Sequence, residues 1–343
     1  MITILIAVLI SFFIVVLFMP GTIRMLRERG MTGIDVHKPE KPEVPKGGGF
    51  ILLFAIVSGL LVVMGLTTFQ VQVEIREGLL AALVSILMAG LIGLLDDSFD
   101  FKNRTKIALP LVASIPMVVM SVGTPTMTIP FIGTINFGVF YALLIVPLMV
   151  TFIVDSTNMY GGMNGLETGL GIINGSAIVI YVIAYPFVSG QEITTALTDS
   201  GTVAASLLGA SVAFFYFNRY PAKVLPGDVG RLPIGAAMAS ALILGNMDRL
   251  AIAMYSPFLL NFILYLFYRV WVRRRNMEYV KFASPREDGT LEVVGPFTMY
   301  WLLPYISKNI TEKKNVNLLL FIQAVIAYGA VMLLLVGLPL SLM

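Results

Sequence analysis

The feature that most constrains this chain is a series of long apolar stretches. A helix needs roughly 20 mainly apolar residues to cross the hydrocarbon core of a bilayer. Ten stretches of about this length are present, at 2–20, 50–68, 78–95, 107–123, 135–154, 168–188, 201–217, 232–247, 250–270 and 316–340. Only 13% of the 343 residues are charged, against about 25% in an average soluble domain. The sequence therefore predicts an all-α polytopic membrane protein, with a single integral membrane domain over residues 1–343.

Charge placement predicts the orientation of these spans. If the N-terminus lies outside, the cytoplasmic loops are 21–49, 96–106, 155–167, 218–231 and 271–315. Together with the adjoining Arg269, they hold 21 of the 23 Lys and Arg residues. Such a bias is the positive-inside pattern of membrane proteins. We therefore expect an outside N-terminus and one cytoplasmic polar face, with a small cytoplasmic insertion between the ninth and tenth spans.

Two residue counts limit the chemistry that this face can perform. The chain has no cysteine and a single histidine, His37. Thiolate metal sites are therefore excluded, and a zinc enzyme or a histidine-based acid–base mechanism is disfavoured. A metal ion would have to be held by oxygen atoms of Asp, Glu, Asn or phosphate. Oxygen ligands favour Mg²⁺, with Mn²⁺ as the alternative.

The first candidate motif is the acidic pair Asp96-Asp97 at the inner end of the third span. Adjacent carboxylates at a membrane boundary are costly to desolvate and repel one another. A divalent cation or the nearby Lys106 would relieve both costs. The alternative interpretation is that these acids only solubilise a helix end.

Two further loops carry glycines together with amides or acids. Residues 155–167 read DSTNMYGGMNGLE, with no Lys or Arg, and residues 218–231 contain Pro226-Gly227-Asp228. Glycines allow a close approach of the backbone to a ligand, and Asn side chains offer both a donor and an acceptor. The alternatives are a helix break with Asn caps and an ordinary type II turn.

The remaining candidate segments are basic. The first loop contains Lys38 and the Gly47-Gly48-Gly49 run, and the last contains Arg286 after Pro285. Such segments suit phosphate groups, and equally suit anionic lipid headgroups. Taken together, carboxylates, amides and cations from five loops on one face are suited to binding a polyphosphate with Mg²⁺.

These residues resemble the polyprenyl-phosphate N-acetylhexosamine-1-phosphate transferases, which are glycosyltransferase 4-like proteins. The resemblance rests on the G-x-x-D-D segment ending in Asp97 with Lys106, on Asn158 followed by GGMNGLE, and on NRYP leading into Gly227-Asp228. The late GTLE turn at 289–292 extends it. The pattern is most similar to the eukaryotic and archaeal UDP-GlcNAc:dolichyl-phosphate branch. The bacterial phospho-MurNAc-pentapeptide translocases are more distant, because the late loop lacks their histidine cluster.

The resemblance implies ten spans, a cytoplasmic active site and Mg²⁺. It implies that Asn158 and Asp228 bind the metal, and that Asn164 contacts uracil. Asp96, Asp97 and Lys106 would act at the acceptor phosphate. Arg286 would contact the pyrophosphate, and Glu167 and Lys38 would also bind substrate. One departure is Pro45-Lys46, where the eukaryotic branch has Pro-Glu.

The implied reaction joins a UDP-N-acetylhexosamine to a polyprenyl or dolichyl phosphate. The lipid phosphate attacks the sugar-bearing phosphorus and UMP leaves, with a covalent aspartyl intermediate as the alternative route. Asp96 would either remove a residual proton or orient Lys106. Membrane lipids are expected partners, nucleic acid is not, and a homodimer is considered. The rival functions are a lipid-linked sugar flippase and a CDP-alcohol phosphotransferase, whose D-G-x-x-A-R pattern does not occur.

Overall fold

The computed structural model describes residues 1–343 apart from 72–75, 130–131 and 338–343. The α-helices are α1 (Ile2–Glu28), α2 (Gly49–Val71), α3 (Glu77–Phe99), α4 (Asn103–Val119), α5 (Val146–Tyr160), α6 (Leu166–Ser189), α7 (Thr195–Asn218), α8 (Asp228–Leu244), α9 (Asp248–Arg275), α10 (Met299–Ile306) and α11 (Glu312–Leu335). A π-helical turn, η1 (Tyr141–Ile145), leads directly into α5. Among the described residues, three antiparallel hairpins are formed by β1 (Thr32–Ile34) with β2 (Glu43–Pro45), β3 (Thr126–Ile129) with β4 (Gly133–Asn136), and β5 (Ser284–Pro285) with β6 (Leu291–Glu292).

Each of the ten predicted spans contains a helix, which confirms the polytopic all-α class. Within the described residues, eight helices are long and apolar enough to cross a membrane. The other two, α4 and α8, have 17 residues each. The last predicted span reaches 340, so its end lies outside the described residues. The segment between the ninth and tenth predicted spans holds β5, β6 and the short helix α10, as expected for an insertion, and its cytoplasmic location stays a prediction.

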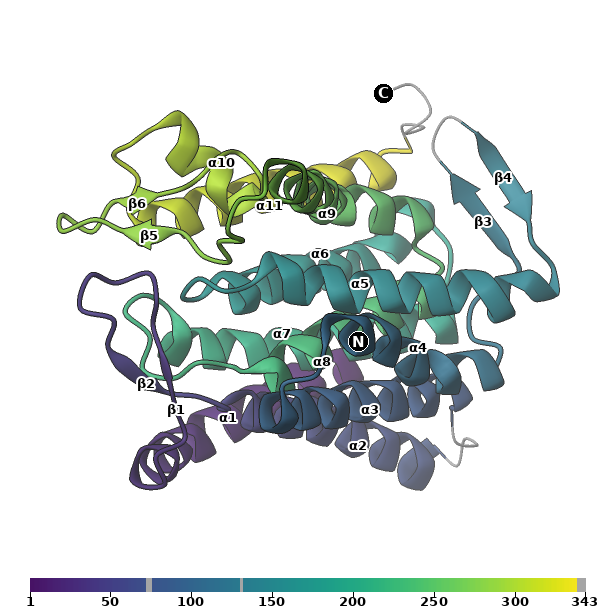
Figure 1. Ribbon diagram of the computed structural model, residues 1–343. Helices are drawn as coiled ribbons and strands as arrows, with labels where there is room; N and C mark the ends of the chain where they lie inside the picture. The colour runs from purple at the N-terminus through teal and green to yellow at the C-terminus, as the bar shows by residue number, and fades with distance from the viewer. Residues whose placement is uncertain (72–75, 130–131, 338–343) are drawn as a thin grey trace.

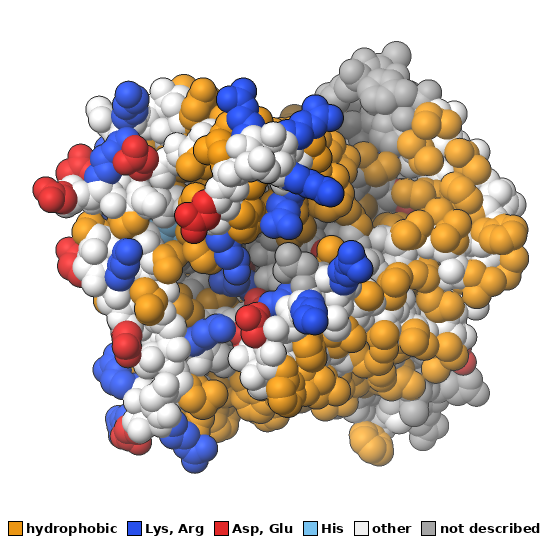
Figure 2. All heavy atoms as spheres, in the orientation of Figure 1, with side chains coloured by type: hydrophobic (Ala, Val, Ile, Leu, Met, Phe, Trp, Pro, Cys, Tyr) orange, Lys and Arg blue, Asp and Glu red, His pale blue; other side chains and the backbone are white. Residues whose placement is uncertain are grey.

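The long helices lie side by side, and the hairpins lie at the two ends of the bundle (Figure 1). The β1–β2 and β5–β6 hairpins and α10 lie at one end, on the left in this view, whereas β3–β4 lies at the other. We call the first end, with segments 29–48, 100–102, 161–165, 219–227 and 276–311, the polar end. Charged side chains gather over it, whereas the opposite side of this view is mainly hydrophobic (Figure 2).

The predicted loop 155–167 is wrong in its first part, because α5 continues to Tyr160 and α6 begins at Leu166. Only 161–165 connects the two helices, and the positive φ angles of Gly162 and Gly165 make this short turn feasible. Helix α5 continues because Val154 and Thr157 pack against Gly235 of the buried helix α8. Asn158 therefore lies on a helix. The other four predicted loops are also shortened by helix ends.

Gly93 allows α3 to pack closely against the first turn of α8. A Cβ at this position would lie 2.3 Å from the carbonyl oxygen of Asp228 and 2.7 Å from the nitrogen of Val229. Both are backbone atoms, which cannot move aside as a flexible side chain can. Small residues at such helix contacts are typical of membrane proteins.

Gly93→Ala is therefore expected to destabilise the fold by about 1–3 kcal/mol through overpacking. The matched control is Gly65→Ala in α2, where an added Cβ meets nothing within 4 Å. Thermal unfolding in detergent should show a lower midpoint for Gly93→Ala than for wild type, and no decrease for Gly65→Ala. Equal midpoints for the two variants would contradict this account of the α3–α8 contact.

Candidate active site

The acidic pair at the end of α3 is held by cations and by backbone N–H groups. Asp96 is buried, and its Oδ1 accepts hydrogen bonds from Lys106 Nζ at 2.9 Å and from the Phe101 N–H at 3.0 Å. Asp97 pairs with Lys46 Nζ at 2.9 Å and accepts the N–H of Val229 at 3.0 Å. The two carboxylates thus join α3 to α4, to the first loop and to α8.

Asp228 is the first residue of α8 and lies beside the acidic pair Asp96-Asp97. Its carboxyl group lies close to that of Asp96, and Arg231 lies one turn further along, with its Nη1 atom 3.6 Å from Asp228 Oδ1. Arg231 Nε also pairs with Glu167 Oε1 at 2.8 Å, and that oxygen accepts the Gly162 N–H at 2.7 Å. We refer to Asp96, Asp97, Glu167, Asp228, Lys46, Lys106 and Arg231 together as the Asp228 cluster.

The donor atoms of the Asp228 cluster suit a hard divalent cation. Four carboxyl groups face three cationic side chains, so the cluster would carry one net negative charge with all of them ionised. The neighbouring carboxylates of Asp96 and Asp228 repel one another unless a proton or a cation lies between them. All the candidate ligand atoms are oxygens, which is the set that Mg²⁺ prefers. Asn158, the other predicted ligand, is half-buried near the end of α5, and its role stays a prediction.

A second polar group, the Lys38 cluster, is formed by Asp35, Lys38, Asn164 and Glu312. Lys38 Nζ lies 2.6 Å from Asp35 Oδ2, from Glu312 Oε2 and from Asn164 Oδ1. Glu312 also accepts the backbone N–H of Asn164 at 2.8 Å, and the Asn164 side-chain oxygen accepts the Ala222 N–H at 2.9 Å. All four side chains are buried. This network fixes the orientation of the Asn164 amide.

His37 lies beside the Lys38 cluster. Its ring packs edge-to-face on Phe282, with centroids 5.8 Å apart, and burial lowers the pKa of His37 to about 4. It is therefore neutral at pH 7. Ligand atoms of Asp35, His37 and Glu312 lie within 4.8 Å of one another. However, the Lys38 ammonium already lies against both carboxylates and neutralises part of their charge.

The structure brings most of the predicted site residues into these two clusters. Asp96, Asp97, Lys106, Glu167 and Asp228 meet in the first cluster, and Lys38 and Asn164 meet in the second. Arg286 lies in the β5–β6 turn, and its side-chain contacts among the described residues are with members of neither cluster. Its guanidinium contacts Glu292 at 3.5 Å and donates to the Lys308 carbonyl at 3.1 Å. Its predicted pyrophosphate contact stays a prediction.

The sequence did not predict that Glu312 belongs to the site. It also did not predict the ion pairs that Asp35, Lys46 and Arg231 form there. Glu312 follows the N-cap Thr311 at the start of α11. Acids are common in the first turn of helices because they interact favourably with the helix dipole. The sequence therefore gives no signal that distinguishes a site residue here from an ordinary capping acid. Arg231 did lie in a predicted motif, three residues after Asp228, but a paired role could not be predicted.

Comparisons with known proteins show the family to which this chain belongs. The family model described as Glycosyl transferase family 4 matches residues 79–246, which include Asp96, Lys106, Asn164 and Asp228. A protein of Saccharolobus solfataricus is 35% identical over 84% of this chain and 83% of its own length. The chain belongs to glycosyl transferase family 4. The Saccharolobus relative is provisionally named UDP-N-acetylglucosamine–dolichyl-phosphate N-acetylglucosaminephosphotransferase.

Two other family members extend the comparison. A Dictyostelium discoideum protein with the same enzyme name is 25% identical over 71% of this chain and 67% of its own length. A phospho-N-acetylmuramoyl-pentapeptide-transferase of Clostridioides difficile is 30% identical over 69% of this chain and 74% of its own length. The names of these relatives describe transferases, and they give no support to the flippase alternative.

Proposed function

We propose that this family 4 member transfers GlcNAc-1-phosphate from UDP-GlcNAc to a polyprenyl phosphate of the dolichyl type. The products are polyprenyl-diphospho-GlcNAc and UMP. The proposal rests on the Asp228 cluster. This cluster places adjacent carboxylates next to Lys and Arg side chains that suit phosphate groups, at the ends of helices of a membrane protein. A lipid-borne phosphate and a water-soluble nucleotide can meet at such a boundary. The names of the Saccharolobus and Dictyostelium relatives support the choice of substrates.

In this proposal an oxygen of the lipid phosphate forms a bond to the phosphorus that bears the sugar. The bond from that phosphorus to the bridging oxygen breaks, and the bridging oxygen leaves with UMP. The acceptor is a phosphate monoester with a second pKa near ~6, so it is mainly dianionic at pH 7. A strong general base is therefore unnecessary, and positioning and charge neutralisation dominate the catalysis.

The side chains of the Asp228 cluster have separate roles in this reaction. Lys106, which is oriented by Asp96, would hold the acceptor phosphate, and Asp97 would hold Lys46 near it. Because Asp96 already accepts two hydrogen bonds, orienting Lys106 fits its contacts better than proton removal does. Asp228 and Asn158 would hold Mg²⁺, which when bound neutralises the charge of the diphosphate. The Lys38 cluster would orient Asn164 toward the base of the nucleotide.

The proposal extends to the orientation of the protein in the cell membrane. The polar end would face the cytoplasm, where nucleotide sugars are accessible, with the N-terminus outside. The excess of Lys and Arg in the loops of this end supports this orientation.

A UMP-release assay tests the proposed function. Purified protein should form UMP only when UDP-GlcNAc and a polyprenyl phosphate are both present, and chelation of divalent cations should stop the reaction. Addition of Mg²⁺ should restore it. Formation of UDP instead of UMP would contradict phosphotransfer, and turnover that persists after complete chelation would contradict the proposed metal dependence.

Asn164→Ala is expected to weaken binding of UDP-GlcNAc by roughly tenfold to a hundredfold, the effect of losing an oriented polar contact worth about 1–3 kcal/mol. The check is the dissociation constant of UDP-GlcNAc measured by calorimetry. Because the side chain also accepts from Lys38 and Ala222, folding is verified by the unfolding midpoint. Unchanged donor affinity in a folded variant would contradict a contact with the donor.

A further inference from the structure

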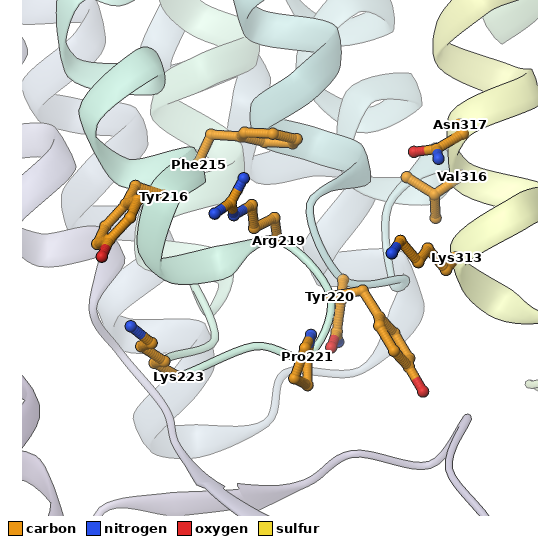
Figure 3. Close-up of a pocket in the computed structure, with 10 residues that line it drawn as sticks. Phe215, Tyr216, Arg219, Tyr220, Pro221, Lys223, Lys313, Val316 and Asn317 are labelled. Atoms are coloured by element: carbon orange, nitrogen blue, oxygen red, sulfur yellow. The ribbon is translucent and has the colours of Figure 1, made fainter.

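Lys106 is the cation to which the proposed reaction assigns the acceptor phosphate, and it does not line the pocket beside Asn164. That pocket has a volume of about 550 Å³ and belongs to the proposed nucleotide site (Figure 3). Apart from Asn164, its lining comes from the end of α7, the loop that follows and the start of α11. Of the described residues that line it, none belongs to the Asp228 cluster. The contacts of Lys106 therefore concern the acceptor.

Lys106 shares its ammonium group between two carboxylates. Its Nζ atom lies 2.9 Å from Asp96 Oδ1 and 3.1 Å from Asp100 Oδ1. The two contacts differ in exposure, because the side chain of Asp96 is 4% exposed and that of Asp100 is 97% exposed. Asp96 is also fixed by the Phe101 N–H, whereas Lys106 is the one hydrogen-bond partner of the Asp100 side chain among the described residues. The inner contact is therefore fixed, and the outer contact can be exchanged.

Asp100 is ionised at pH 7 and lies among cations. The hydrogen bond from Lys106 lowers the pKa of Asp100 below its usual value, and the charges of Lys281 and Lys46 act in the same direction. These three lysines come from α4, the insertion after α9 and the first loop. The Asp100 carboxylate therefore occupies a position beside Lys106 that suits an incoming anion.

The surface next to Lys106 indicates which anion would arrive there. Ile107 follows Lys106 directly and is exposed, and the exposed Leu111 and Ile115 continue the row at intervals of four residues along α4. Residues at this spacing lie on one face of a helix. An exposed apolar face of α4 therefore ends at Lys106. An anion with a hydrocarbon tail in the bilayer can reach the ammonium group on its exposed side, where Asp100 lies.

We propose that the Asp100 carboxylate is an internal competitor of the acceptor phosphate for Lys106. It pairs with Lys106 in the empty protein and is displaced when the phosphate of the lipid binds. The inference rests on the proposed function, because it takes polyprenyl phosphate as the acceptor. An exposed ion pair is weak, since water hydrates both partners, and a dianionic phosphate offers the ammonium group more charge than a carboxylate does. Asp100 therefore lowers the affinity for the acceptor and takes no part in the bond-forming step.

Asp100→Asn separates competition from positioning, because the two roles predict opposite results. Asn keeps the size of the side chain and tolerates the left-handed backbone of Asp100, which has a φ of 45°. Removal of a competitor should lower the KM for polyprenyl phosphate about twofold to fivefold, the effect of losing one exposed ion pair, with kcat unchanged. Native mass spectrometry without a donor should show the same gain in binding of polyprenyl phosphate. If Asp100 instead positions Lys106, KM should rise or kcat should fall.

Two controls identify how the effect arises. Glu40→Gln removes the same charge from an exposed position in the first loop and should leave acceptor affinity unchanged. In a Lys106→Gln background, Asp100→Asn should not change acceptor affinity, because the competition needs the ammonium group. An equal gain in either control, or unchanged or weaker acceptor binding by Asp100→Asn, would overturn the proposal. If Asp100→Asn fails to fold, Asp100→Gly replaces it, because Gly adopts the left-handed conformation most readily.

Failure of this inference can be distinguished from failure of the proposed function. Absence of UMP release by wild type would contradict the transfer reaction, whereas the binding measurement without a donor would still test the role of Asp100. Normal turnover by wild type, with unchanged acceptor affinity in Asp100→Asn, would contradict the competition alone.

Discussion

Asp228→Asn is expected to lower the rate of UMP release by at least about a hundredfold to a thousandfold, the usual effect of removing one electrostatic contact to a transition state. The substitution keeps the size of the side chain and removes its charge. It also leaves Arg231, one turn away, with its partner Glu167. The measurement is UMP release at saturating UDP-GlcNAc and polyprenyl phosphate, with the unfolding midpoint as evidence of an intact fold.

The control for this prediction is Glu287→Gln, which removes a carboxylate from an exposed position in the β5–β6 turn. It should retain wild-type turnover, because the Asp228 cluster does not include it. Turnover within about twofold of wild type in a folded Asp228→Asn protein would contradict the assignment of Asp228 to the reacting phosphates.

Lys38→Met is expected to destabilise the fold by about 3–5 kcal/mol, because it leaves the buried carboxylates of Asp35 and Glu312 without their shared cation. The side chain of Glu312 is 1% exposed, so solvent cannot replace the lost partner. The matched control is Lys314→Met, because Lys314 is exposed in the first turn of α11, the helix that begins with Glu312. It should change the free energy of unfolding by less than about 0.5 kcal/mol. Chemical unfolding in detergent measures both.

A double-mutant cycle separates this ion pair from general packing. The loss of Lys38 leaves the Glu312 carboxylate buried without its cation. The double variant Lys38→Met/Glu312→Gln should therefore lose clearly less free energy of unfolding than the two single variants lose in sum. Strict additivity of the two substitutions would show that the pair is not coupled.

The long helices could be predicted from the sequence because membrane insertion depends on a local property, about 20 successive apolar residues. The ends of these helices could not. Helix α1 continues to Glu28, past the predicted end at 20, because polar residues such as Arg24 and Arg27 can remain helical outside the hydrocarbon. Helix α5 likewise continues through Asn158, where packing against α8 outweighs the polar composition.

The Asp228 cluster was largely predictable because its acids stand out at the ends of apolar stretches. The Lys38 cluster was not, since Lys38 and Glu312 are 274 residues apart. Their contact depends on how α11 docks beside α6, and no local pattern encodes it. Arg286 shows the limit of a resemblance, because a matching motif identified the residue but not its contacts in the β5–β6 turn.

The most direct test of the central claim is to follow the sugar-bearing phosphate of UDP-GlcNAc. Purified protein is incubated with polyprenyl phosphate and UDP-GlcNAc radiolabelled at the β-phosphorus, and the lipid and aqueous fractions are separated. The account predicts that the label enters the lipid fraction in equal amount to the UMP formed, and that Asp228→Asn abolishes both. Label that remains in aqueous UDP while GlcNAc enters the lipid would contradict it.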